Sequence, residues 1–265
     1  MCVNNRRNKE TVQYVVDDLL RATARAEARH FWFRGFRWFV TPVLRRALAG
    51  AQRVRILDCG CGTGANLTLL SKFGAAYGFD VSPVGLGVGR SLGRRNMVRA
   101  RVTAAPFVSG TFDVVTSFDV LYALSEEDQD AALAEMFRLT RPGGCIVINV
   151  AAMQVLRGDH SVLSREVRRY SRRSLGALVS ESGFSVERLT YTNCALVIPL
   201  LLVRGLQRWR GLAPEAGADR EITVPIAPVN AVLSGALYLE SVWLRLFSSP
   251  AGSSLLCVAR KPRQT

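Results

Sequence analysis

The sequence contains very little lysine and very little histidine. Lys9, Lys72 and Lys261 are its only lysines, and His30 and His160 are its only histidines. Nearly all the positive charge therefore comes from arginine, and the formal net charge is +14. Three explanations fit this charge: an arginine-rich genome, an anionic membrane surface, or a nucleic-acid or phosphorylated substrate.

Long hydrophobic runs and closely spaced metal ligands are also absent. The longest apolar stretch, 195–203, is much shorter than the roughly 20 residues of a membrane-spanning helix, and Pro199 interrupts it. No apolar segment follows Arg6 and Arg7, so we predict no secretory signal. The six cysteines lack zinc-binding spacing. We predict no metal site, reduced thiols and a cytoplasmic protein, with peripheral contact at the inner face of the membrane as an option.

The most informative stretch spans residues 54–80. A short apolar run, typical of a buried parallel strand, leads into Asp-Cys-Gly-Cys-Gly-Thr-Gly at 58–64. Glycine is needed where a backbone turns sharply and comes close to a ligand. A helical pattern follows, and then a second strand that ends in Asp80. A carboxylate at that point can accept hydrogen bonds from ribose hydroxyls, so the stretch predicts a nucleotide site.

The acid at the start of this loop narrows the choice of nucleotide. Asp58 precedes the first glycine, and the spacing differs from the G-x-G-x-x-G fingerprint of dinucleotide sites. An acid here is unfavourable for a diphosphate and suits a cationic ligand. A tight strand-to-helix turn without any ligand remains the alternative.

Three segments resemble class I S-adenosylmethionine (SAM)-dependent methyltransferases. Residues 56–64 resemble the first motif of that family, 106–115 its "PF…GxFDVV" segment, and 139–144 its "LRPGG" turn. In the family, the first loop wraps the methionine part of SAM and the acid after the second strand binds the ribose. The resemblance implies SAM contacts at Asp58, Gly60, Cys61, Gly62, Gly64, Asp80, Val81, Phe118 and Asp119.

The adenine side departs from the family pattern. Many members carry an acid that binds the adenine amino group where this chain has Arg101. We therefore expect backbone groups around 102–104 to recognise adenine, and we assign no such role to the Arg101 side chain.

Strand and helix patterns alternate along the chain, which predicts an α/β fold with a mostly parallel sheet covered on both faces. The resemblance implies a Rossmann-like sheet of seven strands with the last strand antiparallel. It divides the chain into an N-terminal helical cap (1–50), a SAM-binding core (51–192), a helical insertion or lid (193–252) and the final strand (253–265). We expect the helices of the insertion at 196–210 and 229–247.

Two segments have ambiguous local patterns. Thr41 and Pro42 are typical of a helix start, so we expect a separate short helix from there to about Gly50, after a first helix at 11–29. Ser82 and Pro83 predict another helix start. Glycines at 85, 87 and 89 follow, and each weakens a helix by about 1 kcal/mol. That segment is irregular, mobile or closely packed.

Aromatic residues and arginines alternate at 30–39. They can stack on and pair with a flat anionic substrate, pack against the sheet edge, or lie at a membrane interface. Core packing is the default. We predict substrate contacts at Phe31, Trp32, Arg34, Tyr122, Arg169 and Tyr170.

The candidate catalytic base is His160, because histidine titrates near neutral pH. The surrounding block resembles a bacterial subgroup of the family, with a histidine ten residues before the triplet Arg-Arg-Tyr at 168–170. Two positions depart from that pattern: Ser161 replaces an acid, and Glu166 replaces a second histidine. If His160 is not the base, it orders the loop.

The predicted function is methyl transfer from SAM to a small or lipid-linked acceptor, on oxygen. The alternatives are an RNA methyltransferase, a catalytically silent SAM-fold module that binds a membrane or a partner, and, disfavoured by the glycine spacing, a nicotinamide oxidoreductase. The apolar faces of the insertion and its arginines (Arg204, Arg208, Arg210 and Arg245) can rest on an anionic membrane, or the insertion can simply pack on the core.

Overall fold

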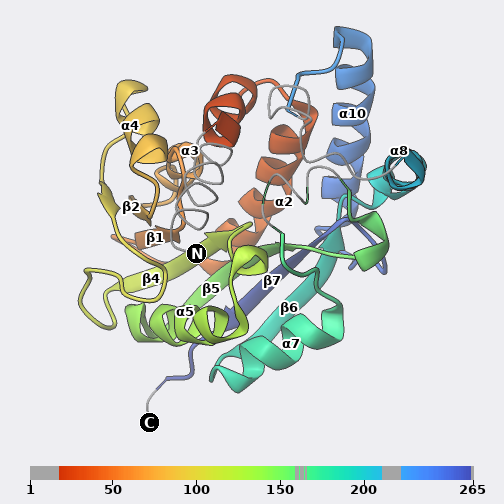
Figure 1. Ribbon diagram of the computed structural model, residues 1–265. Coiled ribbons are helices and arrows are strands. Elements are labelled where there is room, and N and C mark those ends of the chain that lie inside the picture. Colours follow the sequence, from red (N-terminus) through yellow and green to blue (C-terminus); the bar gives the residue numbers. More distant parts are fainter. Residues whose placement is uncertain (1–17, 159–160, 162–163, 165, 211–221, 264–265) are drawn as a thin grey trace, which may run out of the picture.

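A seven-stranded sheet lies at the centre of the structure (Figure 1), a computed structural model that describes residues 18–263 except 159–160, 162–163, 165 and 211–221. The strand order is β3-β2-β1-β4-β5-β7-β6. Only β7 runs antiparallel to its neighbours, β5 and β6. The strands are β1 (Arg55–Cys59), β2 (Ala75–Asp80), β3 (Met97–Arg99), β4 (Phe112–Phe118), β5 (Thr140–Ala151), β6 (Ser185–Thr192) and β7 (Ser254–Arg260). The predicted fold class is confirmed.

Helices cover both faces of this sheet. They are α2 (Phe31–Ala47), α3 (Ala65–Leu70), α4 (Pro83–Ser91), α5 (Glu126–Leu139), α7 (Arg172–Glu181), α8 (Val197–Arg210) and α10 (Ala227–Trp243). Side chains alternate between the faces along each strand: Ile56 packs with α2, α3 and α4, whereas Leu57 packs with α5 and α7. Both residues are fully buried. The centre of the sheet therefore needs apolar residues on both sides, as the sequence provides.

Helix α2 is continuous through Pro42, so the predicted helix start at Thr41 is wrong. The Thr41 hydroxyl donates instead to the Arg37 carbonyl one turn earlier, at 2.6 Å. Val40 and Leu44, on either side of the proline, are fully buried. Burial on both sides outweighs the one backbone hydrogen bond that proline removes. Of the helix predicted at 11–29, residues 18–26 are helical, and 11–17 lie outside the described residues.

Helix α4 is regular despite its glycines, because two of them pack tightly against the loop after β1. The Ser82 hydroxyl caps the helix by accepting from the amide of Gly85 at 3.1 Å. A Cβ added at Gly85 would lie 3.0 Å from the Gly62 carbonyl oxygen, and one at Gly89 would lie 2.3 Å from that of Thr63. Close packing, one of the three options for this segment, is the one observed.

The insertion between β6 and β7 forms α8 and α10, and α10 lies alongside α2 (Figure 1). The Asn230 side chain accepts from the Phe31 amide at 2.9 Å, which satisfies a free donor at the start of α2. A Cβ at Gly35 would lie 2.4 Å from Leu237, so the two helices approach closely there. The insertion is thus fixed to the N-terminal segment rather than to the sheet alone.

The glycines of α4 allow a matched test of this packing. Gly89→Ala should destabilise the protein by about 1–3 kcal/mol, because the methyl group overlaps the Thr63 carbonyl. Gly87→Ala, where nothing lies within 4 Å, should stabilise it by about 0.4–1 kcal/mol. Urea unfolding measures both. Equal effects at the two positions would contradict the close contact between α4 and the loop after β1.

Candidate active site

The candidate site lies where the strand order reverses, between β1 and β4. In open α/β sheets, ligands bind beyond the carboxyl ends of the strands at this point. Four parts of the chain meet there, each at or just after the carboxyl end of a strand: the glycine loop 60–64 after β1, Asp80 at the end of β2, Asp119 after β4, and the chain after β5.

The glycine loop has a backbone conformation that side chains rarely adopt. Gly60, Gly62 and Gly64 have φ values of 76°, 54° and 77°. The amides of Gly60 and Cys61 both donate to the Phe79 carbonyl at 2.9 Å, which fastens the loop to β2. A Cβ at Gly60 would lie 2.4 Å from Val120, so only glycine fits at this position.

Asp58 is a buried carboxylate with one oxygen that has no partner. Its Oδ1 accepts from the Thr116 hydroxyl at 2.6 Å, across the β1–β4 register. Its Oδ2 is buried and receives no hydrogen bond. Burial raises the pKa of Asp58 to about 7; the Thr116 hydrogen bond opposes this rise and the charge of Asp80 adds to it. A buried acceptor without a partner is costly, and a cationic ligand group would satisfy it.

Asp80 connects the glycine loop to the start of α4. Its two oxygens accept from the amides of Gly62 and Ser82, each at 2.8 Å. An ionised carboxylate has about four acceptor positions, so about half of them stay available for ribose hydroxyls. Val81, the next predicted residue, is 59% exposed, and its carbonyl accepts from Arg99 at 3.1 Å.

Asp119 follows β4 in a strained backbone conformation, with φ of 61°. Its Oδ1 accepts from the Asn149 side chain, and its amide donates to the Asn149 carbonyl, at 3.0 and 2.9 Å. The residue is exposed to solvent, but the surrounding protein limits its hydration and raises its pKa to about 7. Next to it, Phe118 makes an edge contact with Phe36 of α2, with ring centroids 4.9 Å apart.

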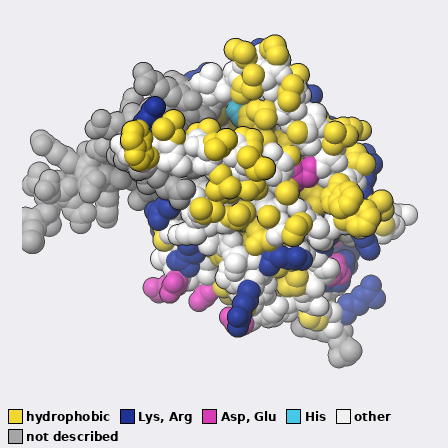
Figure 2. All heavy atoms as spheres, turned by 90° about the vertical axis from the view of Figure 1, so that its right-hand side faces the viewer, with side chains coloured by type: hydrophobic (Ala, Val, Ile, Leu, Met, Phe, Trp, Pro, Cys, Tyr) yellow, Lys and Arg dark blue, Asp and Glu magenta, His cyan; other side chains and the backbone are white. Residues whose placement is uncertain are grey.

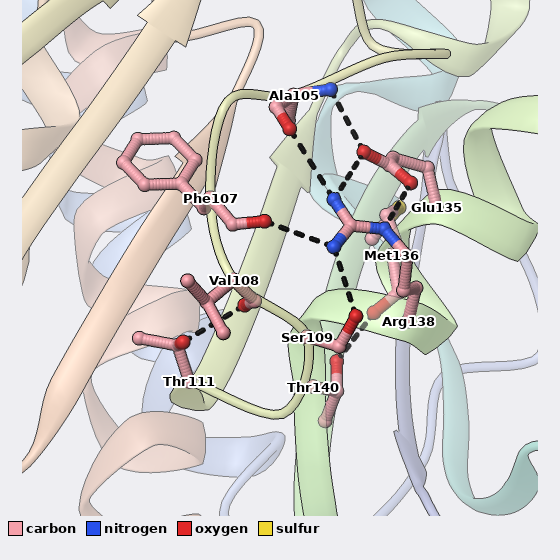
Figure 3. Close-up of polar contacts among 9 residues, drawn as sticks. All are labelled: Ala105, Phe107, Val108, Ser109, Thr111, Glu135, Met136, Arg138 and Thr140. Atoms are coloured by element: carbon pink, nitrogen blue, oxygen red, sulfur yellow. Dashed lines mark hydrogen bonds and ion pairs between the residues drawn. The ribbon is translucent and has the colours of Figure 1, made fainter.

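The loop after β3, on the expected adenine side, is fixed by an ion pair from α5 (Figure 3). Arg138 donates to the carbonyls of Ala105 and Phe107, at 3.2 and 2.9 Å. Its partner Glu135, 2.7 Å away, accepts from the Ala105 amide at 2.8 Å. The Arg101 side chain is 70% exposed. The structure thus fixes the backbone at Ala105 and Phe107, next to the segment 102–104 where we expect adenine to be recognised.

Residues 18–26 lie over the glycine loop. Leu20 reaches to 3.3 Å from a Cβ added at Gly62. Glu27, just after this helix, forms a buried ion pair with Arg94, and Arg94 also donates to the Thr63 carbonyl at 3.1 Å. The N-terminal segment therefore belongs to the surroundings of the cofactor site.

The aromatic segment packs against the core. Phe31 and Trp32 are half-buried against the apolar cluster on the α2 side of the sheet. The Arg34 guanidinium lies over the Trp38 ring, 5.3 Å from its centroid. Core packing, the default expectation, is observed, and the substrate contacts of Phe31, Trp32 and Arg34 stay predictions.

The chain after β5 is organised by a buried ion pair. Arg169 binds both carboxylate oxygens of Glu166 and donates to the Ser161 hydroxyl at 3.1 Å. Its side chain is 9% exposed and that of Glu166 is 3% exposed. Glu166 and Ser161, the two departures from the subgroup pattern, thus form one structural unit with Arg169. His160, the predicted base, lies outside the described residues.

Tyr122 and Tyr170 connect this unit to the rest of the fold. The Tyr122 carbonyl accepts from the amides of Val167 and Arg168, at 2.9 and 3.3 Å. Tyr170 is 5% exposed, and its hydroxyl donates to Gln129 of α5. The structure therefore brings Tyr122 and Arg169 together beside Asp119 but buries Tyr170 in the core. Their roles in substrate binding stay predictions.

Sequence reasoning missed Thr116 and Asn149, which position Asp58 and Asp119. Asn149 had a usable signal, since it is the one polar side chain within the apolar run 145–151. Thr116 could be found only by placing β4 beside β1 in the correct register, where it stands opposite Asp58.

Comparisons with known proteins agree with this geometry. Residues 57–148 match the family described as Methyltransferase domain. Over 160 residues the chain is 30% identical to the ubiquinone/menaquinone biosynthesis C-methyltransferase UbiE of Shewanella piezotolerans, an alignment that covers 53% of this chain and 60% of that protein. The chain thus spans only about 60% of the length of this curated relative.

Solved structures share the fold at low sequence identity. A chain of the complex between the Haloferax volcanii Trm112 methyltransferase activator and a methyltransferase superposes with a TM-score of 0.59 and 18% identity, over 93% of this chain and 95% of that one. Phosphoethanolamine N-methyltransferase 2 of Haemonchus contortus, in complex with SAM, superposes with a TM-score of 0.52 and 16% identity, over 85% and 53%.

The family match includes the glycine loop and the strand ends that carry Asp58, Asp80 and Asp119. The sheet order and the antiparallel last strand match the fold that the resemblance implied. Residues 57–148 thus match a methyltransferase domain, and the fold around them is the one that solved methyltransferase structures share.

Proposed function

We propose that this protein transfers a methyl group from SAM to a small or lipid-linked acceptor. The observation that carries the proposal is the buried Oδ2 of Asp58, which lacks a hydrogen-bond partner beside the glycine loop. SAM has a cationic ammonium group in its methionine part and a ribose with two hydroxyls. Asp58 and Asp119 fit the first, and the free acceptor positions of Asp80 fit the second.

In this proposal, the residues of the chain bind SAM and orient it toward the acceptor. When bound, SAM supplies a methyl group that its positive sulfur already activates. Asp80 positions the ribose side, and the fastened glycine loop fixes the methionine side, so that an acceptor over Asp119 and Tyr122 is aligned for displacement. No cluster of metal-ligating side chains occurs among the described residues, and the proposal requires none.

The acceptor is expected to ionise before it is methylated. Oxygen methylation needs a hydroxyl group to lose its proton, and the same ionisation makes the ring carbon next to a phenolic hydroxyl nucleophilic. Oxygen is our prediction from the sequence. Carbon is the second candidate, because the Shewanella piezotolerans relative is named a C-methyltransferase of ubiquinone and menaquinone biosynthesis. That similarity also favours a small acceptor over RNA. A lipid-linked acceptor would be met at a membrane surface.

The binding of S-adenosylhomocysteine should tighten as pH rises through about 7. Asp58 has a raised pKa of about 7, so it is largely protonated at lower pH and cannot neutralise the ligand ammonium. Ionisation of this group between about pH 6 and pH 8 predicts about a tenfold gain in affinity, with release of a proton. Calorimetry in buffers of different ionisation enthalpy measures both quantities.

The variant Asp58→Asn is the control for this pH dependence. It should bind more weakly, because the amide carries no charge, and its affinity should change less with pH. If the unaltered protein binds S-adenosylhomocysteine equally well or more weakly as pH rises over this range, Asp58 does not bind the ligand ammonium.

The acceptor class is tested with SAM labelled in its methyl group. Separate incubations contain quinols, a bacterial lipid extract and RNA. The first two should move label into the organic phase, and Asp58→Ala should lose most of this transfer. Hydroiodic acid cleaves O-methyl ethers but not C-methyl groups, which separates the two candidate atoms. Label transferred only to RNA would contradict the proposed acceptor. No transfer at all, with S-adenosylhomocysteine still bound, would indicate a silent module.

A further inference from the structure

The insertion presents a large apolar face to solvent. Three residues of α8 (Ile198, Leu202 and Trp209) and three on or just after α10 (Val232, Leu239 and Leu246) are each at least 70% exposed. The spacings of four and seven residues place each set on one side of its helix. Figure 2 shows hydrophobic side chains gathered over this side of the molecule. We call these six residues the apolar face.

The opposite sides of the two helices explain why this face points outward. Leu237 of α10 is fully buried against Gly35 of α2, and Leu200 of α8 packs against the same core. The core needs only one side of each helix, so it does not account for the apolar residues on the other. Single exposed apolar residues are ordinary, whereas a contiguous apolar patch indicates a binding surface.

Within α8 and α10 themselves, arginines outnumber acids by three to one. Glu240 is the only acidic residue in the sequences of α8 and α10, and its carboxylate accepts from the amides of Cys194 and Ala195, at 2.8 and 3.0 Å. Arg210 and Arg245, at the ends of these helices, are exposed. The apolar face is thus bordered by positive charge, and its one acid is bonded to backbone.

Two further arginines, Arg188 and Arg46, lie around the end of α10 that Arg245 follows. Arg188 donates to the carbonyls of Leu244 and Phe247. Burial, and after it the charge of the nearby Arg46, lowers the pKa of Arg188. Neither Arg46 nor Arg245 forms an ion pair with an acid in the part of the chain that the structure describes.

We propose that the apolar face rests on an anionic lipid bilayer, with the arginines at its margin contacting the headgroups. An apolar surface flanked by arginine suits the boundary between acyl chains and anionic headgroups. A second copy of the chain suits it poorly, because each copy has a net charge of +14 and the one acid within α8 and α10, Glu240, is already bonded to backbone amides. None of the described helices meets the length and hydropathy needed to cross a bilayer, so the contact is peripheral.

This contact would place the candidate site near its acceptor, and in that respect it rests on the proposed function. Asn230 of α10 binds the start of α2, and Phe36 of α2 contacts Phe118 beside the candidate cofactor site. The same two helices thus connect the apolar face with the site.

The test is flotation of the purified protein with lipid vesicles. The unaltered protein should float with vesicles of phosphatidylcholine and phosphatidylglycerol, less with phosphatidylcholine alone, and less again at high salt. The double variant Leu202→Glu/Leu246→Glu should lose binding by about tenfold or more. Both side chains are exposed, so the fold should survive. Val108→Glu is the matched control: this apolar residue is 78% exposed in the loop between β3 and β4, outside the apolar face.

Three results would overturn the proposal: no flotation of the unaltered protein, equal flotation of the double variant, or loss of binding in Val108→Glu. Analytical ultracentrifugation without lipid adds a fourth, since a dimer that the double variant converts to a monomer would make the apolar face a contact between copies. Titration with S-adenosylhomocysteine reports on the proposed function separately. A double variant that binds this ligand normally but no longer floats would support the membrane contact alone.

Discussion

One buried carboxylate constrains the candidate site more than any other group. Asp58 stands at the end of β1, fully enclosed, with only Thr116 as a side-chain partner. An unsatisfied buried carboxylate oxygen destabilises a fold by an amount comparable to a lost hydrogen bond or more. The chain keeps this group at the reversal point of the sheet, where ligands bind. Binding of a cationic ligand explains an arrangement that stability alone does not.

The surroundings of Asp58 are built to hold the backbone close to such a ligand. The glycine loop is bonded to β2, Asp80 joins it to α4, and two glycines of α4 allow that helix to lie against it. Residues 18–26 cover the other side. The loop is thus fixed by contacts from three segments, which favours a pre-formed site over one that assembles on binding.

The sequence predicts those features that depend on local pattern. The order of strands, the glycine loop and the acid at the end of β2 follow from apolar periodicity and residue type. The predicted helix break at Thr41 was wrong because burial of Val40 and Leu44 keeps the helix continuous through Pro42. Burial depends on tertiary packing, which local pattern does not show. The glycines of α4 were ambiguous for the same reason. Periodicity predicted broad apolar sides for α8 and α10. It could not show which side of each helix packs on the core and which stays exposed.

The central claim is that the glycine loop and Asp80 bind SAM rather than a dinucleotide. Calorimetric titration of the purified protein with S-adenosylhomocysteine, with NAD as the control ligand, tests it most directly. The account predicts roughly micromolar binding of S-adenosylhomocysteine alone, weakened by about 1.5–3 kcal/mol in Asp80→Ala through the lost ribose hydrogen bonds. Binding of NAD in its place, or unchanged affinity in Asp80→Ala, would contradict it.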